Sequence, residues 1–396
     1  MNAARLFSRA SVLTLAGGVA LISALGMSGG EAVALDDASH YVFVPNRGSA
    51  DIAVIDTRTD KVVRRISVGE VPHQVAVSPA EGKIAVTNTA DNTLSIIDLD
   101  RLTAEAAVPL DEEPEHMALS PAGDTVAVGN IGAGTVSFVS LATGRETARV
   151  DGLFEPHNMT FNADGGQLYV GNLGASFVSV IDVASGRVTD EIAVGAGKTV
   201  AALDGAADAA HQGIINVTST PDGKLGFAAY GEGDRMAVID MASREVVRTL
   251  ELGDLPWRAF TTADGRYMLV PNNGDRTVSV FSTASLEEVA RLPGGEDMTG
   301  INTGWFDTLA YVISRGEDKA IVLDLTTMER VGEVALPSSP ETGVVTPDGR
   351  KLYVALSGSD QVAVIDVRAM AVVEMIGGVG EEPWGAHMVG AINYCH

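Results

Sequence analysis

The sequence predicts an all-β fold, an eight-bladed β-propeller in which similar four-stranded sheets are arranged in a ring. Three observations support this prediction: a repeat with a period of 42 residues, four short alternating runs within each repeat, and two chain ends that carry complementary parts of one repeat. Four strands in about 40 residues are typical of one propeller blade.

The period is clearest in the second run of each repeat, which reads YVFVPN, KIAVTN, TVAVGN and QLYVGN in the first four repeats. The final asparagines of these runs are 42 residues apart, at Asn46, Asn88, Asn130 and Asn172. The next equivalent position, Tyr230, follows after 58 residues, which is one period with 16 extra residues inserted. The spacing of 42 then resumes with Asn272, Ser314 and Leu356. The chain therefore contains eight equivalent units.

The other runs of each repeat also have the composition of short strands. Ten residues after each of these positions a run such as IAVID or VSVID ends, followed by a run such as VVRRISV and then by one such as PHQVAVSP. The runs are rich in β-branched residues and alternate in polarity, and the breaks between them carry Asn, Asp, Pro and Gly. This pattern predicts strands joined by tight hairpins.

The two chain ends are expected to close the ring together. The chain begins on the second strand of a blade (YVFVP) and ends on a lone first strand (WGAHMVGAIN). Pairing of these segments in one blade would complete that blade and remove the open sheet edges. A ring of seven blades with one distorted unit is the alternative, but eight periods and the insertion account for almost all of the chain from Tyr41 to His396.

Residues 1–34 are predicted to be a secretory signal peptide. Arg5 and Arg9 precede the apolar run SVLTLAGGVALISALG, and Ala32 and Ala34 form an Ala-x-Ala cleavage site. A retained membrane anchor is the alternative, but the run is only marginally long enough to cross a bilayer, which takes ~20 apolar residues. The mature chain, residues 35–396, is therefore expected to be a single propeller domain in the periplasm, with no membrane span after cleavage.

Charge and cysteine content restrict the classes of partner. The formal net charge of −25 argues against nucleic acid and anionic lipid, which bind clustered Lys and Arg, and suits a protein that binds cations. Cys395 is the single cysteine, so no internal disulfide is expected. The sequence has no C-x-x-C-H motif, so no covalently attached c-type haem is expected either.

The runs YVFVPN, QLYVGN, VAVID and VAVSP resemble the YVTN-type β-propeller family. That family is similar in architecture to the eight-bladed haem d1 domains of periplasmic nitrite reductases. The resemblance covers essentially the whole mature chain and implies the propeller fold, but such folds host many unrelated activities. Some exported propellers are zinc chaperones for the binding proteins of ABC transporters, and this chain is similar to them in size, compartment and placement of histidines.

Five of the seven histidines fall at or near the start of a blade's innermost strand: His73, His116, His157, His211 and His387. Because innermost strands line the central channel of a propeller, residues about 40 apart in sequence gather around one axis. Three or four imidazoles from neighbouring blades could therefore bind one metal ion. The alternative is that each histidine is a polar residue whose ring bonds to a nearby backbone carbonyl.

The register of these histidines is uneven. His73 and His157 directly follow a proline, His116 lies one residue later, and His387 lies four residues after Pro383. Since strand residues advance about 3.3 Å each, the four rings cannot all lie in one plane. The fifth histidine, His211, belongs to the insertion (about residues 196–213), which is expected either to cover the channel mouth and add a ligand or to be a solvated loop.

The residues around the histidines favour a cation. The loops that lead into the innermost strands are acidic and include Glu115 and Glu155, which would concentrate cations at the channel mouth. Imidazole with carboxylate suits a divalent transition metal, with zinc the first choice and copper the second. Trp257 and Trp384 are expected to narrow the channel or to form pocket walls, with Arg258 beside them as an anion anchor.

Two features leave the ligand set open. Cys395 would join the main site only if the chain bends back at Gly390, and otherwise lies toward the other end of the channel. Methionines beside the histidines would favour copper(I) if they cluster at the ion, but such residues also fill gaps between blades.

These features predict an exported metal-binding propeller, most directly a periplasmic zinc chaperone or delivery protein whose partner is the solute-binding protein of a metal transporter. The alternatives are a copper-dependent oxidoreductase in the same channel, a haem d1-type cofactor-binding protein and a protein-interaction scaffold. The sequence assigns no enzymatic activity, and a Ser-His-Asp hydrolase has no support because no G-x-S-x-G elbow on a strand-to-helix turn is expected.

Overall fold

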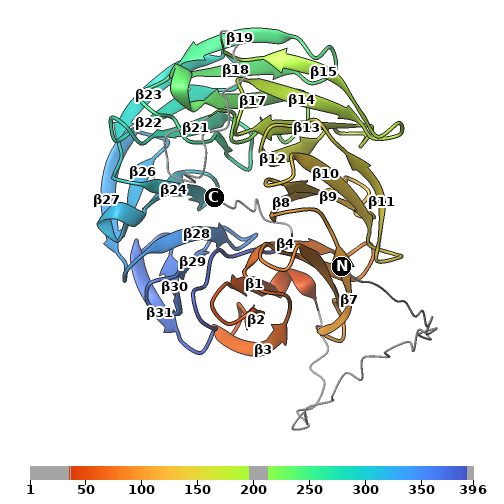
Figure 1. The fold of residues 1–396 in the computed structure, drawn as a ribbon. Coiled ribbons are helices and arrows are strands. Elements are labelled where there is room, and N and C mark those ends of the chain that lie inside the picture. Colours follow the sequence, from red (N-terminus) through yellow and green to blue (C-terminus); the bar gives the residue numbers. More distant parts are fainter. Residues whose placement is uncertain (1–34, 36, 196–212, 390–396) are drawn as a thin grey trace, which may run out of the picture. The chain divides into compact units, whose positions relative to one another are not determined.

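The computed structural model describes residues 35, 37–195 and 213–389, which form eight antiparallel sheets arranged in a ring (Figure 1). The predicted eight-bladed propeller is therefore confirmed, and the seven-bladed alternative is excluded. The predicted signal peptide, His211 with most of the insertion, and Cys395 lie outside the described residues, so those expectations stay predictions.

In the seven four-stranded blades, strands that follow one another in the chain are hydrogen-bonded neighbours, and the strand nearest the ring axis comes first. The innermost strands are β4 (Pro72–Ser78), β8 (Pro114–Leu119), β12 (Pro156–Phe161), β16 (Thr218–Ser219), β20 (Phe260–Thr261), β24 (Met298–Gly304) and β28 (Pro340–Val345). The second strands are β1 (Tyr41–Asn46), β5 (Lys83–Asn88), β9 (Thr125–Asn130), β13 (Gln167–Asn172), β17 (Leu225–Tyr230), β21 (Tyr267–Asn272), β25 (Leu309–Ser314) and β29 (Lys351–Leu356).

The outer half of each blade is equally regular. The third strands are β2 (Asp51–Asp56), β6 (Thr93–Asp98), β10 (Thr135–Ser140), β14 (Phe177–Asp182), β18 (Arg235–Asp240), β22 (Thr277–Ser282), β26 (Lys319–Asp324) and β30 (Gln361–Asp366). The outermost strands are β3 (Lys61–Ser67), β7 (Thr103–Pro109), β11 (Arg145–Val150), β15 (Arg187–Ala193), β19 (Val246–Glu251), β23 (Glu287–Pro293), β27 (Glu329–Ala335) and β31 (Ala371–Ile376). Three short 3-10 helices complete the described elements: η1 (Ala38–His40), η2 (Gly231–Gly233) and η3 (Arg315–Glu317).

The burial pattern explains the composition of the strands. The second and third strands are covered by neighbouring blades on both faces, and nearly all of their residues are buried. They are therefore rich in valine and isoleucine, which pack well in such positions. The outermost strands alternate between exposed and partly buried residues, because one face meets solvent.

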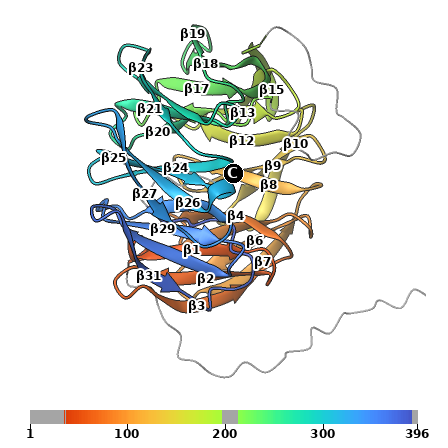
Figure 2. The same cartoon turned by 90° about the vertical axis from the view of Figure 1, so that its left-hand side faces the viewer.

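The two ends of the described propeller complete one blade, as predicted. The sheet of β1, β2 and β3 lacks a regular innermost strand, and isolated bridges join Phe43 to His387 and Asn46 to Pro383 in its place. The N–H of Phe43 donates to the His387 carbonyl oxygen at 2.8 Å, and the N–H of His387 donates to the Phe43 carbonyl oxygen at 3.0 Å. Figures 1 and 2 place the first and last blades side by side.

The core consists of apolar clusters shared by neighbouring blades. Val42 and Val44 of β1, for example, belong to the same cluster as Val344 of β28 and Tyr353 of β29, so the first and last blades pack against each other. Equivalent clusters join the other blades. Among the described residues no helix is long and apolar enough to span a membrane.

The asparagine that ends the repeat motif has a structural role in several blades. Asn130 is fully buried, and its Nδ2 donates to the hydroxyls of Thr135 and Ser137, each at 2.9 Å. Asn88 makes the same pair of bonds to Thr93 and Ser95. The motif thus ties the end of the second strand to the start of the third by side-chain hydrogen bonds.

We expect Asn130→Ala to destabilise the protein by about 2–3 kcal/mol, because it removes two buried hydrogen bonds and leaves two hydroxyls without their donor. Urea unfolding followed by circular dichroism would measure the change. Thr103→Ala, at an exposed position of an outermost strand, is the control and should change stability by less than about 0.5 kcal/mol. Equal effects of the two substitutions would contradict the role given to the motif.

Candidate functional site

Three neighbouring innermost strands, β4, β8 and β12, begin in the same way. Pro72, Pro114 and Pro156 pair with the motif asparagines Asn88, Asn130 and Asn172 and therefore occupy equivalent positions. In each of these three strands the register shifts after the proline, which marks a bulge. Bulges turn side chains away from the direction that a regular strand would give them, and here the bulged residues include three of the predicted ligands.

The residue before each proline is also special. Val71, Glu113 and Glu155 have φ angles of 52°, 54° and 49°, in the left-handed region that residues other than glycine rarely adopt. The turn that leads into the innermost strand is thus repeated with its strained conformation in successive blades. It brings His73, Glu115 and His157, each next to its proline, to equivalent positions around the axis.

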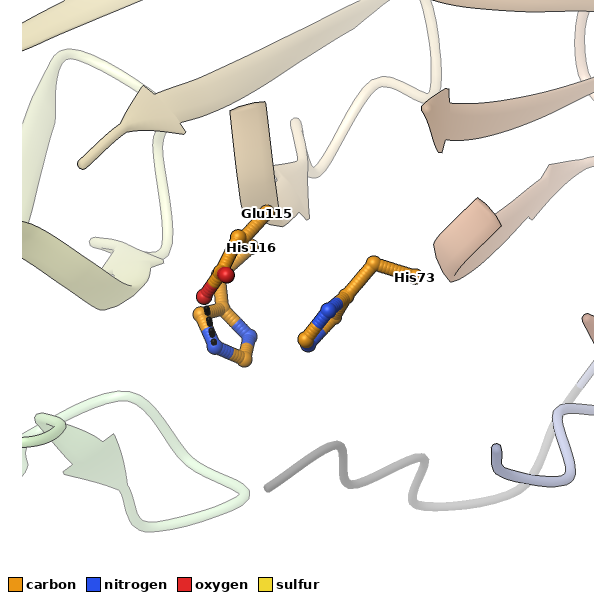
Figure 3. A group of neighbouring side chains, drawn as sticks. All are labelled: His73, Glu115 and His116. Carbon is orange, nitrogen blue, oxygen red and sulfur yellow. Dashed lines mark ion pairs between the residues drawn. The ribbon is translucent and has the colours of Figure 1, made fainter. Parts of the chain in front are cut away.

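A group of three ionisable side chains forms where β4 and β8 begin (Figure 3). One ligand atom from each of His73, Glu115 and His116 lies within 4.8 Å of the others. The rings of His73 and His116 meet edge to face with centroids 4.8 Å apart, and the Nε2 of His116 is 3.8 Å from a carboxylate oxygen of Glu115. His116 is fully buried and His73 is 4% exposed.

His157 packs against this group without belonging to it. Its ring centroid is 3.8 Å from that of His116. Its Nδ1 lies 3.2 Å from the Ile215 carbonyl oxygen and 3.1 Å from Nδ2 of Asn158. Depending on its tautomer, Nδ1 either donates to the Ile215 carbonyl oxygen of the neighbouring blade or accepts from the Asn158 amide of its own strand, and the ring packs beside His116.

His387 lies deeper along the axis. His387 pairs with Phe43. In the next blade the position equivalent to Phe43 is Ala85, and its partner is Ala76. His387 is therefore equivalent to Ala76, which lies three residues after His73. Its side chain is fully buried, and neither ring nitrogen has a hydrogen-bond partner among the described residues. Burial lowers the pKa of His387 to about 4. The structure thus brings His73 and His116 together and leaves His387 outside their group.

Glu115, which the sequence suggested as a funnel residue, is part of the group itself. Burial raises the pKa of its carboxyl to about 7; the nearby Arg47 acts against this shift and Glu113 adds to it. The guanidinium of Arg47 stacks over the ring of Trp384 at 4.1 Å, and Trp384 lies 6.1 Å from the His73 ring. Trp384 therefore lies as a wall beside the group.

The remaining predicted residues lie around the group. Glu155 stays in the turn before β12 and is partly exposed. Trp257 is anchored by its backbone N–H, which donates to the Pro271 carbonyl oxygen, and Arg258 is 4% exposed. The methionines beside the histidines pack in the clusters between blades: Met117, Met159, Met298 and Met388.

Comparison with known proteins addresses the family and the fold. Residues 75–392 match the sequence profile of the YNCE-like beta-propeller family. No curated protein sequence matches the chain.

Several solved structures are similar in fold. Dihydro-heme d1 dehydrogenase NirN, in complex with DHE, has a TM-score of 0.72 and 15% identity, over 89% of this chain and 76% of that chain. Hydrazine synthase from Kuenenia stuttgartiensis has a TM-score of 0.57 and 21% identity, over 74% of this chain and 95% of that chain. A protein of unknown function from Desulfotomaculum acetoxidans has a TM-score of 0.59 and 15% identity, over 88% of this chain and 98% of that chain. At these identities the likeness concerns the fold.

The raised pKa of Glu115 predicts a pH-dependent loss of stability. An unfolded glutamate ionises near pH 4.5 and the folded one near 7, so the folded state is penalised increasingly from pH 4.5 to 7 and fully above 7. The free energy of unfolding of Glu115→Gln, relative to that of the wild type, should therefore rise by roughly 3 kcal/mol between pH 4 and pH 8. Urea unfolding with a chelator present measures it, and Glu70→Gln, at the exposed mouth, controls for the change in net charge. A constant difference between Glu115→Gln and wild type at both pH values would contradict this origin.

The lowered pKa of His387 acts in the opposite direction. Between pH 6.5 and 4 the unfolded imidazole takes up a proton and the buried one does not, so stability falls as the pH drops through this range. Over that interval the free energy of unfolding of His387→Gln should fall by roughly 3 kcal/mol less than that of the wild type, whatever the stability of the variant at pH 7. His40→Gln, outside the inner strands, is the matched control, and identical pH profiles for wild type and His387→Gln would refute the prediction.

Proposed function

We propose that this chain, which belongs to the YNCE-like β-propeller family, binds a divalent transition metal at His73, Glu115 and His116 and carries it for delivery. Zinc is the preferred metal and copper the second. The proposed setting is the periplasm, and the proposed recipient is the solute-binding protein of a metal transporter. The family and the fold leave these points open, so the proposal depends on the chemistry of the site.

The convergence of three donor side chains is the observation that carries the proposal. Two imidazoles and one carboxylate, with ligand atoms within 4.8 Å of one another, are a donor set that zinc accepts. In a tetrahedral zinc site with bonds of 2.0–2.2 Å, ligand atoms are about 3.4 Å apart. The ligand atoms would therefore have to approach one another by up to about 1.4 Å, which small side-chain rotations can supply.

The ligand count also suits delivery. Three protein ligands leave one position of a tetrahedral zinc ion for water or for an incoming ligand. A ligand from a recipient protein can enter at that position and draw the ion away in steps. Glu115 is the most accessible of the three, with a side chain that is 26% exposed, so an exchange would begin beside it.

The surroundings favour zinc over copper(I). Copper(I) prefers thioether and thiolate ligands, but the four methionines beside the histidines are packed in apolar clusters between blades. The carboxylate of Glu115 is a hard ligand that suits a divalent ion. A partly buried carboxylate and two buried imidazoles are also costly without a cation, and a bound metal would offset that cost.

The test is metal binding by chelator competition with the full mature chain. We expect tight zinc binding with a stoichiometry near one, and a loss of roughly 100-fold or more in the His73→Ala/His116→Ala double variant. His157→Ala should have a much smaller effect, and His40→Ala none. Unchanged zinc affinity in the double variant would overturn the site.

A second measurement addresses the role. Zinc-loaded protein mixed with a metal-free zinc-binding protein of a periplasmic transporter should lose its zinc faster than it does to buffer alone. Copper with a visible absorption band in protein purified without chelator would instead favour the copper oxidoreductase, and a haem band the cofactor-binding alternative. Failure to transfer zinc, with binding intact, would refute delivery.

A further inference from the structure

A cavity that could hold a ligand lies beyond the histidine group along the ring axis. Its volume is about 730 Å³, and it is lined by innermost strands β4, β8, β12, β16 and β20 and by the turns that follow the last four of them. We call it the inner cavity. Gln74 and Asn158, which follow His73 and His157 in the chain, form its end nearest to the histidines.

We propose that the inner cavity binds a small hydroxylated carboxylate, with the carboxylate group on Arg258. This site is separate from the metal group, and its existence does not depend on the proposed metal function. Its volume is within the range of ~300–1,000 Å³ that is usual for small-molecule sites.

The position of Arg258 is the first argument. Pro256 pairs with Asn272 as Pro72 pairs with Asn88, so Arg258 occupies the position that Gln74 and Asn158 have in their blades. Its side chain is 4% exposed and lies over the Phe260 ring at 5.3 Å. A guanidinium held in this way presents a planar fork of donors that matches a carboxylate.

The charges around the cavity also favour an anion. Of the lining residues, Arg258 is the cation and Asp222 the carboxylate. Asp222 belongs to the turn after β16, and its carboxylate accepts hydrogen bonds from the Thr220 hydroxyl and from the backbone N–H of Lys224, whose side chain pairs with it at 2.8 Å. Arg258 is therefore the cationic side chain that the lining offers to an anion, in a protein whose net charge is −25.

The uncharged lining favours hydroxyl groups on the ligand. It includes side-chain amides and threonine hydroxyls, among them Gln74, Asn158, Asn216, Thr218, Thr220 and Thr261. The carbonyl oxygen of the Gln74 side chain accepts from the backbone N–H of Met117 at 2.7 Å, so its amino group is the part that can donate to a ligand. Met117, Met159 and Phe161 supply an apolar wall for a short carbon chain.

Isothermal titration calorimetry of the metal-free mature chain with gluconate and with glucose would test the inference. Gluconate is a hydroxylated monocarboxylate, and glucose is its neutral counterpart of similar size. We expect gluconate to bind and glucose to bind at least tenfold more weakly, because a charge-assisted pair is lost. The proposal would be overturned if gluconate did not bind at about 10 mM, or if gluconate and glucose bound with equal affinity.

Two variants and one control assign the binding to this cavity. Arg258→Gln should weaken gluconate binding at least tenfold, whereas Arg248→Gln, at an exposed position of β19, should leave it unchanged. Gln74→Glu is the second test, to be used if Arg258→Gln does not fold. It keeps an oxygen for the Met117 N–H but adds a negative charge to the wall, so it should also weaken gluconate binding at least tenfold. Wild-type affinity in the folded variants would refute the site. Zinc titration of the same samples separates this outcome from failure of the metal proposal.

Discussion

The structure depends on the backbone pairing between Phe43 and His387, which closes the ring. Without it β1 would be an open edge strand and the first blade would lack its inner strand. Closure joins segments from opposite ends of the chain, so its entropic cost is appreciable. The apolar cluster shared by Val42, Val44, Val344 and Tyr353 offsets that cost, because it buries the facing sides of the first and last blades.

Closure also determines which side chains can meet. Strands β4, β8 and β12 each begin at a proline that pairs with the motif asparagine and follows a residue with positive φ, so equivalent positions in these three blades lie at the same level of the axis. His73 and Glu115 are such equivalents, and His116 joins them because the bulge after Pro114 places two residues where a regular strand would place one. The candidate metal group thus depends on which residues occupy a bulge that β4, β8 and β12 share.

The ionisable residues Glu115 and His387 beside the axis lower the stability of the folded state, which is common at functional sites. Burial favours the uncharged form of both Glu115 and His387, so each makes stability depend on pH, one above pH 4.5 and the other below pH 6.5. Apolar residues of the same size would be better for stability at these positions. The retention of ionisable groups beside the axis is understandable if ligands offset the cost, a cation at His73, Glu115 and His116 and an anion at Arg258.

By itself the sequence determined the eight blades, their four strands and the closure of the ring, because period, alternation and turn residues are local patterns, as the spacing from Asn46 to Asn172 illustrates. It also identified His73 and His116 as neighbours, since they lie in adjacent repeats. The spacing of His387 from Pro383 also indicated that its ring lies at another level than that of His73. The tertiary structure alone decided that Glu115 joins His73 and His116 and that His157 packs beside His116. The reason is that the direction of these side chains depends on bulges, which arise from pairing between strands and leave no pattern in the residues themselves.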